Sequence, residues 1–101
     1  MNSSTVDQRD AAATRVEVNA DSLTVELADG RTVAAPLAWY PRLMHANEAE
    51  RKDWRLIGGG RGIHWPAVDE DISVANILAG QPSMESQTSL KKWLDARAKA
   101  S

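Results

Sequence analysis

The sequence GGGRGIHWPAVDEDISVANILAG, residues 58–80, decides how this chain folds. After its opening glycines, Ile63 and Trp65 alternate with small or polar residues, which is the pattern of a strand with one buried face. Pro66 has no amide hydrogen and is expected to end that strand or to keep it at a sheet edge. The first half of the stretch therefore predicts a glycine turn followed by a short strand.

A short helix is expected over residues 74–79. Ser73 precedes it, and a serine hydroxyl at this position accepts hydrogen bonds from the unpaired amides of the first turn. Ile72 and Ile77 occupy the two positions of a hydrophobic staple, and Gly80 suits the left-handed residue that closes a helix. Because so short a helix is unstable alone, packing must hold it.

An antiparallel meander of three strands is expected over residues 14–35. Apolar and polar residues alternate over 23–27, and Asp29-Gly30 is a strong signal for a two-residue hairpin turn. Residues 1–13 are polar and show no periodicity, so they are predicted to form a disordered arm.

Helices are expected to follow the meander. Pro41 suits the first position of a helix, and Asn47 with Glu50 three residues later matches a capping box. A helix is therefore predicted from residue 48 to about residue 56. The sequence leaves open whether residues 41–56 form one helix or two.

The composition limits the classes of protein to which this chain can belong. The chain has 101 residues, 43% of them hydrophobic, no cysteine and a formal net charge of −2. One small domain is therefore expected, without disulfides or cysteine-based zinc sites and without an overall attraction to nucleic acid or anionic membranes. No apolar run reaches the roughly 20 residues of a membrane span, and the N-terminus lacks the apolar core of a secretion signal, so a cytoplasmic location is expected.

Together these features predict an α+β fold, with a three-stranded antiparallel meander followed by short helices, one further strand and a C-terminal amphipathic helix. We divide the chain into an arm (1–13), an α+β domain (14–80) and a linker with the C-terminal helix (81–101). That helix is predicted over about residues 88–99.

The C-terminal helix carries one narrow stripe, because Leu90, Trp93, Leu94 and Arg97 recur at spacings of three and four. Its other charges make it net basic. Two interpretations stay open: the stripe docks the helix on its own domain, or it inserts into the groove of a partner.

Several of these features resemble the domain of unknown function 2442 family. They are the Asp29-Gly30 hairpin, WYPRL at 39–43, Glu50-Arg51 and above all GIHWPAVDEDISVANILAG at 62–80. The resemblance covers about residues 15–80, and the tail SLKKWLDAR resembles an extension of some members.

The resemblance implies a small α+β fold in bacterial and phage-type proteins, fused in some relatives to a helix-turn-helix DNA-binding domain. It also implies frequent encoding beside a small protein of the domain of unknown function 4160 family, in a toxin–antitoxin-like arrangement. It transfers no catalytic residues.

The glycine-rich loop, Gly58 to Gly62, has consecutive backbone amides and includes Arg61, and both features suit a bound phosphate. However, the loop leads into a strand rather than a helix and lacks the lysine and hydroxyl residue that end a P-loop. The sequence therefore favours a turn that joins a helix to a strand.

His64 and the acidic triplet Asp69-Glu70-Asp71 have the residue types of a metal site or an acid–base pair. No metal-binding spacing accompanies them, and His64 is expected to face away from the core. Three other interpretations of the triplet stay open: favourable charge at the start of the following helix, a solvated acidic turn, or a recognition patch for a basic partner, aided by a nearby tryptophan.

The leading hypothesis is a non-enzymatic protein-interaction domain, the neutralising or regulatory member of a two-protein module. Such a domain would use no cofactor and bind a small protein partner or form a homo-oligomer. The alternatives are a DNA-associated transcriptional regulator, and a metal-binding protein or enzyme that uses His64 and the triplet. The candidate partner-binding residues are Trp39, Arg61, His64, Trp65, Asp69, Glu70, Asp71, Leu90, Trp93, Leu94 and Arg97.

Overall fold

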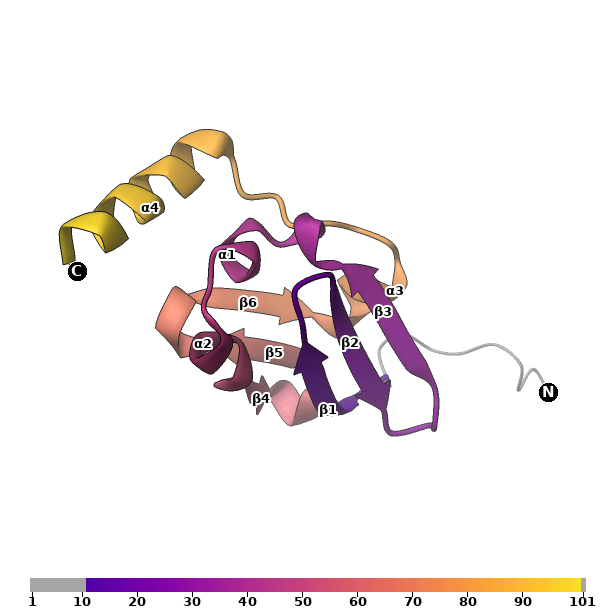
Figure 1. The fold of residues 1–101 in the computed structure, drawn as a ribbon. Helices are drawn as coiled ribbons and strands as arrows, with labels where there is room; N and C mark the ends of the chain where they lie inside the picture. Colours follow the sequence, from indigo (N-terminus) through magenta and orange to yellow (C-terminus); the bar gives the residue numbers. More distant parts are fainter. Residues whose placement is uncertain (1–10, 101) are drawn as a thin grey trace.

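Figure 1 shows two small antiparallel sheets, several short helices and one longer helix at the C-terminal end. In this computed structural model, residues 11–100 are described. The first sheet is a meander of three strands, in the order β1 (Ala13–Val18), β2 (Ser22–Leu27) and β3 (Thr32–Pro36). The α+β class and the predicted meander are therefore confirmed.

The inner face of the meander follows the alternation in the sequence. Val16 pairs with Val25 across β1 and β2, and Leu23 pairs with Ala35 across β2 and β3. All four side chains are buried, while the residues between them face outward or are half-buried. A strand period of two thus places one face of the sheet on the core.

The turn between β2 and β3 differs from the predicted two-residue hairpin. The amide of Leu27 donates to the carbonyl of Arg31, so the loop consists of Ala28, Asp29 and Gly30. Only Gly30 has a positive φ, of +94°. Asp29 closes the loop with its carboxylate, which accepts the Arg31 backbone N–H at 3.0 Å and the Arg31 guanidinium at 2.8 Å.

The predicted N-terminal arm, residues 1–13, extends too far toward the domain. Ala11 and Ala13 are buried, and the carbonyl of Ala12 accepts a hydrogen bond from the Ala28 amide at 2.8 Å. Residues 11–13 therefore belong to the packed domain, because small alanines fit against the sheet. The rest of the predicted arm, residues 1–10, lies outside the described residues.

A second antiparallel sheet stands where the sequence predicts one further strand. Its three strands are β4 (Arg55–Ile57), β5 (Gly62–Trp65) and β6 (Glu70–Ser73), in that order. The middle strand is the predicted one. The prediction for residues 53–56 as helix is wrong, because the helix ends at Lys52 and β4 follows.

Two short helices precede this sheet, α1 (Pro41–Met44) and α2 (Glu48–Lys52), so residues 41–52 form two helices rather than one. Both halves of the predicted capping box are present. The Asn47 side chain accepts the Glu50 amide at 2.8 Å, and the Glu50 carboxylate accepts the Asn47 amide at 2.9 Å.

After the second sheet come α3 (Val74–Leu78) and α4 (Gln87–Ala100). The predicted cap of α3 is confirmed, since the Ser73 hydroxyl accepts the Asn76 amide at 3.3 Å and Gly80 has a φ of +72°. Short 3-10 segments complete the connections: η2 (Leu37–Trp39), η3 (Gly58–Gly60) and η4 (Pro66–Val68).

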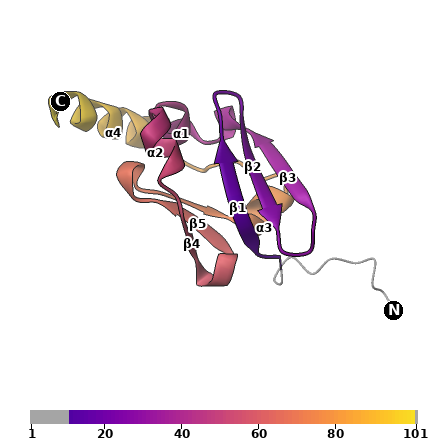
Figure 2. The same ribbon diagram turned by 60° about the horizontal axis from the view of Figure 1, so that its bottom comes forward.

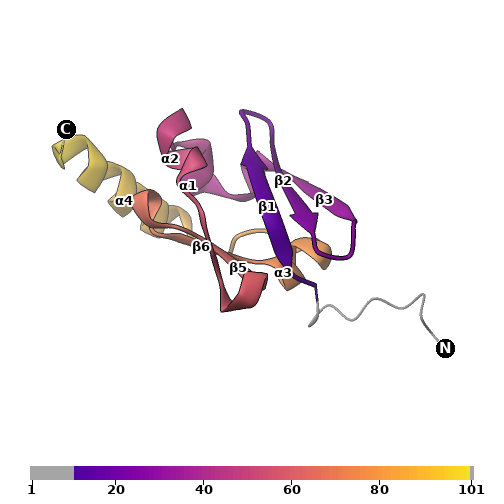
Figure 3. The same ribbon diagram turned by 90° about the horizontal axis from the view of Figure 1, so that it is seen from below.

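Both sheets contribute to one hydrophobic core. The largest fully buried side chains come from the first sheet, the second sheet and the segments that connect them: Leu23, Val25, Ile63, Trp65, Leu37, Leu43, Val68 and Val74. Helices α1 and α2 lie between α4 and the meander in the views of Figures 2 and 3. No helix of the described chain is long and apolar enough to cross a membrane.

Candidate functional site

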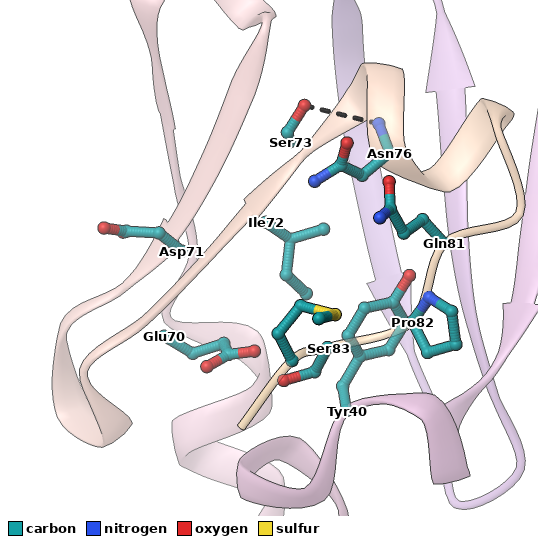
Figure 4. A pocket seen from close by; sticks show the side chains of 10 residues that line it. Tyr40, Glu70, Asp71, Ile72, Ser73, Asn76, Gln81, Pro82 and Ser83 are labelled. Carbon is teal, nitrogen blue, oxygen red and sulfur yellow. Dashed lines mark hydrogen bonds between the residues drawn. The ribbon is translucent and has the colours of Figure 1, made fainter. Parts of the chain in front are cut away.

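A small pocket opens between β6, α3 and the segment that follows α3 (Figure 4), with a cavity volume of about 160 Å³. We call it the Tyr40 pocket. The residues that line it include Tyr40, Glu70, Asp71, Asn76, Gln81, Ser83 and Met84. The pocket joins side chains from before α1, from β6 and from the chain after α3.

Tyr40 forms a wall of the pocket because it lies between η2 and α1. The residue is 2% exposed, and its hydroxyl has no hydrogen-bond partner within residues 11–100. Figure 4 shows the hydroxyl directed toward the side of the pocket where Asn76 and Gln81 lie. Burial, together with the negative charge of Glu70, raises the pKa of the Tyr40 phenol, so the hydroxyl keeps its proton at neutral pH.

Two acidic residues line the pocket, the half-buried Glu70 and the exposed Asp71. Burial raises the pKa of the Glu70 carboxyl to about 7, and the nearby carboxylate of Glu85 adds to the effect, with smaller contributions from Asp71 and Asp69. Arg42 opposes the rise but does not cancel it. Within the part of the chain that the structure describes, no hydrogen bond is made to this carboxylate.

The raised pKa of Glu70 predicts a pH-dependent stability. The folded protein holds a proton on Glu70 that the unfolded chain releases above about pH 4.5, so stability falls as pH rises through about 7. Glu70→Gln, which mimics the protonated side chain, should therefore raise Tm at pH 8 by a few degrees, about 1 kcal/mol after allowance for partial solvation, and have little effect at pH 4. Thermal unfolding followed by circular dichroism measures this; an equal shift at both pH values would contradict it.

Arg42, on α1, holds the outer wall of the pocket in place. Its guanidinium binds the Glu85 carboxylate through Nη2 at 2.7 Å and Nε at 2.9 Å, and it donates to the carbonyls of Val68 and Asp69 at 3.1 and 3.3 Å. The side chains of Arg42 and Glu85 are 16% and 9% exposed, which strengthens the pair. The hydrogen bonds lower the pKa of Glu85, so this carboxylate stays ionised beside Arg42.

The other acidic residues do not gather at the start of α3. Asp69 has a left-handed backbone, with φ of +53°, and ends η4. Glu70 and Asp71 are strand residues, paired with Trp65 and His64. The interpretation of the triplet as charge at the start of a helix is therefore wrong, since these residues form the β5–β6 hairpin.

His64 faces away from the core, as predicted, and its Nδ1 lies in hydrogen-bond contact with the Asp71 carboxylate across the two strands. The His64 side chain is 31% exposed and that of Asp71 is 67% exposed. Within the described residues, no group of three or more histidine, cysteine or acidic side chains is arranged to hold a metal ion. The pair therefore has the geometry of a surface cross-strand contact.

The glycine-rich loop joins β4 to β5, so it connects two strands rather than the predicted helix and strand. Gly58, Gly59 and Gly60 all have positive φ. Gly60 is buried against the start of β1, and a Cβ on it would lie 2.7 Å from the Ala13 carbonyl oxygen. Close packing on β1 thus accounts for the glycine at 60, and the Arg61 side chain is exposed.

Two tryptophans among the predicted partner-binding residues face the protein interior instead. Trp65 is fully buried and its indole N–H donates to the Arg51 carbonyl at 3.1 Å, so it offers no surface to a partner. Trp39 is half-buried and packs against the core. Its carbonyl accepts the Ser83 amide at 3.0 Å and so fixes the segment that forms the outer wall of the Tyr40 pocket.

Helix α4 contacts its own domain. Trp93 packs partly buried against the core, with the guanidinium of Arg42 5.1 Å from its ring and that of Arg97 4.6 Å away. Arg97 also binds the Glu50 carboxylate at 2.9 Å. Leu90 and Leu94 are half-buried on the same helix. The predicted stripe therefore lies on the side of α4 that carries these contacts.

Sequence reasoning singled out Glu70 but missed Tyr40, Arg42 and Glu85. Tyr40 and Arg42 lie inside the WYPRL segment, whose unusual composition is the one available signal. Nothing in the sequence indicates that this segment meets residues 30 to 43 positions later.

The fold and the pocket define a small two-sheet α+β domain with one shared core and an acidic cavity beside its second sheet. The sequence profile of the family described as Protein of unknown function (DUF2442) matches residues 13–83, and the chain belongs to that family. The resemblance drawn from the sequence is thereby confirmed, and α4 lies beyond the matched residues.

The chain is also similar to a crystal structure of a protein of unknown function from Rhodospirillum rubrum ATCC 11170. The two are 24% identical with a TM-score of 0.66, over 76% of this chain and 95% of that chain. This likeness shows a common fold. A search of curated proteins found no match to this chain.

Proposed function

We propose that this domain is a non-enzymatic, cytoplasmic protein-binding domain, the neutralising or regulatory member of a toxin–antitoxin-like pair, and that it binds its protein partner along β4. The observation that carries the proposal is the open edge of this strand. β4 pairs with β5 on one side, and all three of its residues are exposed. Its outer position in the second sheet is visible in Figure 1.

An open strand edge presents unpaired N–H and C=O groups, and an extended segment of another chain completes them as an added strand. Leu56 and Ile57 are 36% and 44% exposed, so two aliphatic side chains stand beside that backbone. Such side chains give an added strand apolar contact as well as hydrogen bonds. Arg55 places a charge at the end of the edge and opposes pairing between two copies of this chain.

The remaining polar groups support binding rather than catalysis. His64 is engaged with Asp71, and within residues 11–100 no serine, threonine or tyrosine hydroxyl hydrogen-bonds to it. The gene arrangement that the family resemblance implies, beside a small protein of the domain of unknown function 4160 family, supports a protein partner of similar size.

Affinity capture tests this function. The tagged full chain, incubated with lysate of its native host, should retain one small protein in a near-equimolar amount, and Leu56→Lys should reduce that retention at least about tenfold. Met44→Lys is the matched control, because Met44 is 43% exposed on α1 and should retain the partner. In the complex, hydrogen exchange should slow along β4. Recovery of no partner, or equal retention by the Leu56→Lys variant, would reject the proposal.

A further inference from the structure

We propose that the Tyr40 pocket binds an alkylguanidinium group, the side-chain group of arginine, with the Glu70 carboxylate as its counter-ion and the Tyr40 hydroxyl oxygen as a hydrogen-bond acceptor. This site is separate from the β4 edge, so it goes beyond the proposed function.

The first observation is an excess of unused polar groups around the cavity. The Tyr40 hydroxyl, the Glu70 carboxylate and the side-chain amides of Asn76 and Gln81 make no hydrogen bonds among the residues that the structure describes. A buried hydroxyl without a partner costs about 1–3 kcal/mol of stability. The Tyr40 hydroxyl is the buried one, while Glu70 is half-buried and Asn76 and Gln81 are exposed. A buried hydroxyl beside these groups indicates that a ligand or water completes it.

The second observation is the chemistry of these groups. A carboxylate only accepts hydrogen bonds, and a phenol or a side-chain amide oxygen also accepts them. A guanidinium has five N–H donors in one plane and no acceptor. A guanidinium therefore matches the acceptor groups of the pocket better than an anion does, and it offers more N–H donors than an ammonium.

The third observation is the charge around the cavity. Glu70 faces Glu85, Asp71 and Asp69, and the cation near it is Arg42. Arg42 is already engaged with Glu85 and two carbonyls, which leaves Glu70 without an ion pair within 4.0 Å in the described chain. A bound cation would supply the missing partner and favour the ionised form of Glu70.

The size of the cavity agrees with this ligand. A cavity of about 150 Å³ holds one benzene molecule, and the Tyr40 pocket has a volume of about 160 Å³. A planar guanidinium is smaller than benzene, so the alkyl stem has room toward the opening. Gln81 and Met84, which line the pocket, are exposed, with Met84 85% exposed.

Calorimetric or NMR titration of the full chain with methylguanidinium, N-acetyl-arginine methylamide and free arginine at pH 8 tests the inference. We expect a Kd of about 1 mM for the head group alone, as suits one ion pair and a few hydrogen bonds. Glu70→Gln should weaken binding at least about tenfold, and Tyr40→Phe about threefold. Stronger binding of the methylamide would identify a protein side chain as the source, and stronger binding of free arginine would identify a small molecule.

Asp69→Asn is the matched control, because it removes the same charge beside the pocket while Asp69 does not line it. It should leave the affinity within about twofold. Affinity in the wild type should also fall from pH 8 to pH 6 as Glu70 gains a proton, with no such change in the Glu70→Gln variant. Absence of binding by all three probes would show that the pocket holds only water, and binding that Glu70→Gln leaves unchanged would show that the probes do not pair with Glu70; either result would overturn the proposal.

Discussion

Trp65→Ala is expected to destabilise the domain by about 4 kcal/mol, which corresponds to a fall in Tm of roughly 20 °C for a domain of this size. Trp65 is fully buried in the core to which both sheets contribute, so its removal leaves a cavity in that core. The substitution also removes the indole N–H that binds the Arg51 carbonyl. Chemical denaturation measures the change directly.

Trp65→Phe separates the two contributions. Phenylalanine keeps most of the buried area but has no N–H, so we expect a loss of about 1–2 kcal/mol. If Trp65 were a contact for a partner, as the sequence led us to expect, Trp65→Ala would weaken binding and leave stability within about 0.5 kcal/mol. That second result would contradict the burial on which the shared core depends.

The meander and the helix caps could be predicted because their signals are local. The alternation over 23–27 predicts one buried face of β2. Asn47 and Glu50, three residues apart, cap the start of α2. The cap at Ser73 and the stop at Gly80 are local in the same way. These elements therefore appear in the structure close to where the sequence places them.

The second sheet could not be predicted in full, because its outer strands lack the local signals. β4 has three residues and is exposed throughout, so no period-2 pattern marks it. β6 begins with Glu70 and Asp71, whose charge is typical of turns, and its pairing with β5 fixes it as a strand. Tertiary pairing decides both strands, as is common for strand propensity.

The candidate site could not be predicted from the sequence, for a related reason. Tyr40, Glu70 and Gln81 meet only in the folded chain, because they come from the junction of η2 and α1, from β6 and from the segment after α3. Neither residue type nor spacing indicates this. The acidic triplet was visible in the sequence, but only the structure shows that Glu70 and Asp71 line the pocket while Asp69, which has a left-handed backbone, does not.

Gly60→Ala is expected to destabilise the domain by about 3 kcal/mol or more, since two costs combine there. The backbone has a φ of +90°, which an L-residue rarely adopts, and the added Cβ would lie 2.7 Å from the Ala13 carbonyl oxygen and 3.2 Å from the Ala12 Cβ. These are atoms of the chain where β1 begins, so the first sheet must shift away from the loop. Equilibrium denaturation should show the loss.

Gly59→Ala provides the comparison within the same loop. Its φ is +69°, and nothing lies within 4 Å of an added Cβ, so only the backbone cost of about 1 kcal/mol applies. The difference between the two variants, about 2 kcal/mol, measures the contact between η3 and β1. Equal losses would mean that the glycines at 59 and 60 are needed only for their backbone angles, and that the loop does not pack on β1. Such a result would restore the loop as a candidate surface for an anion.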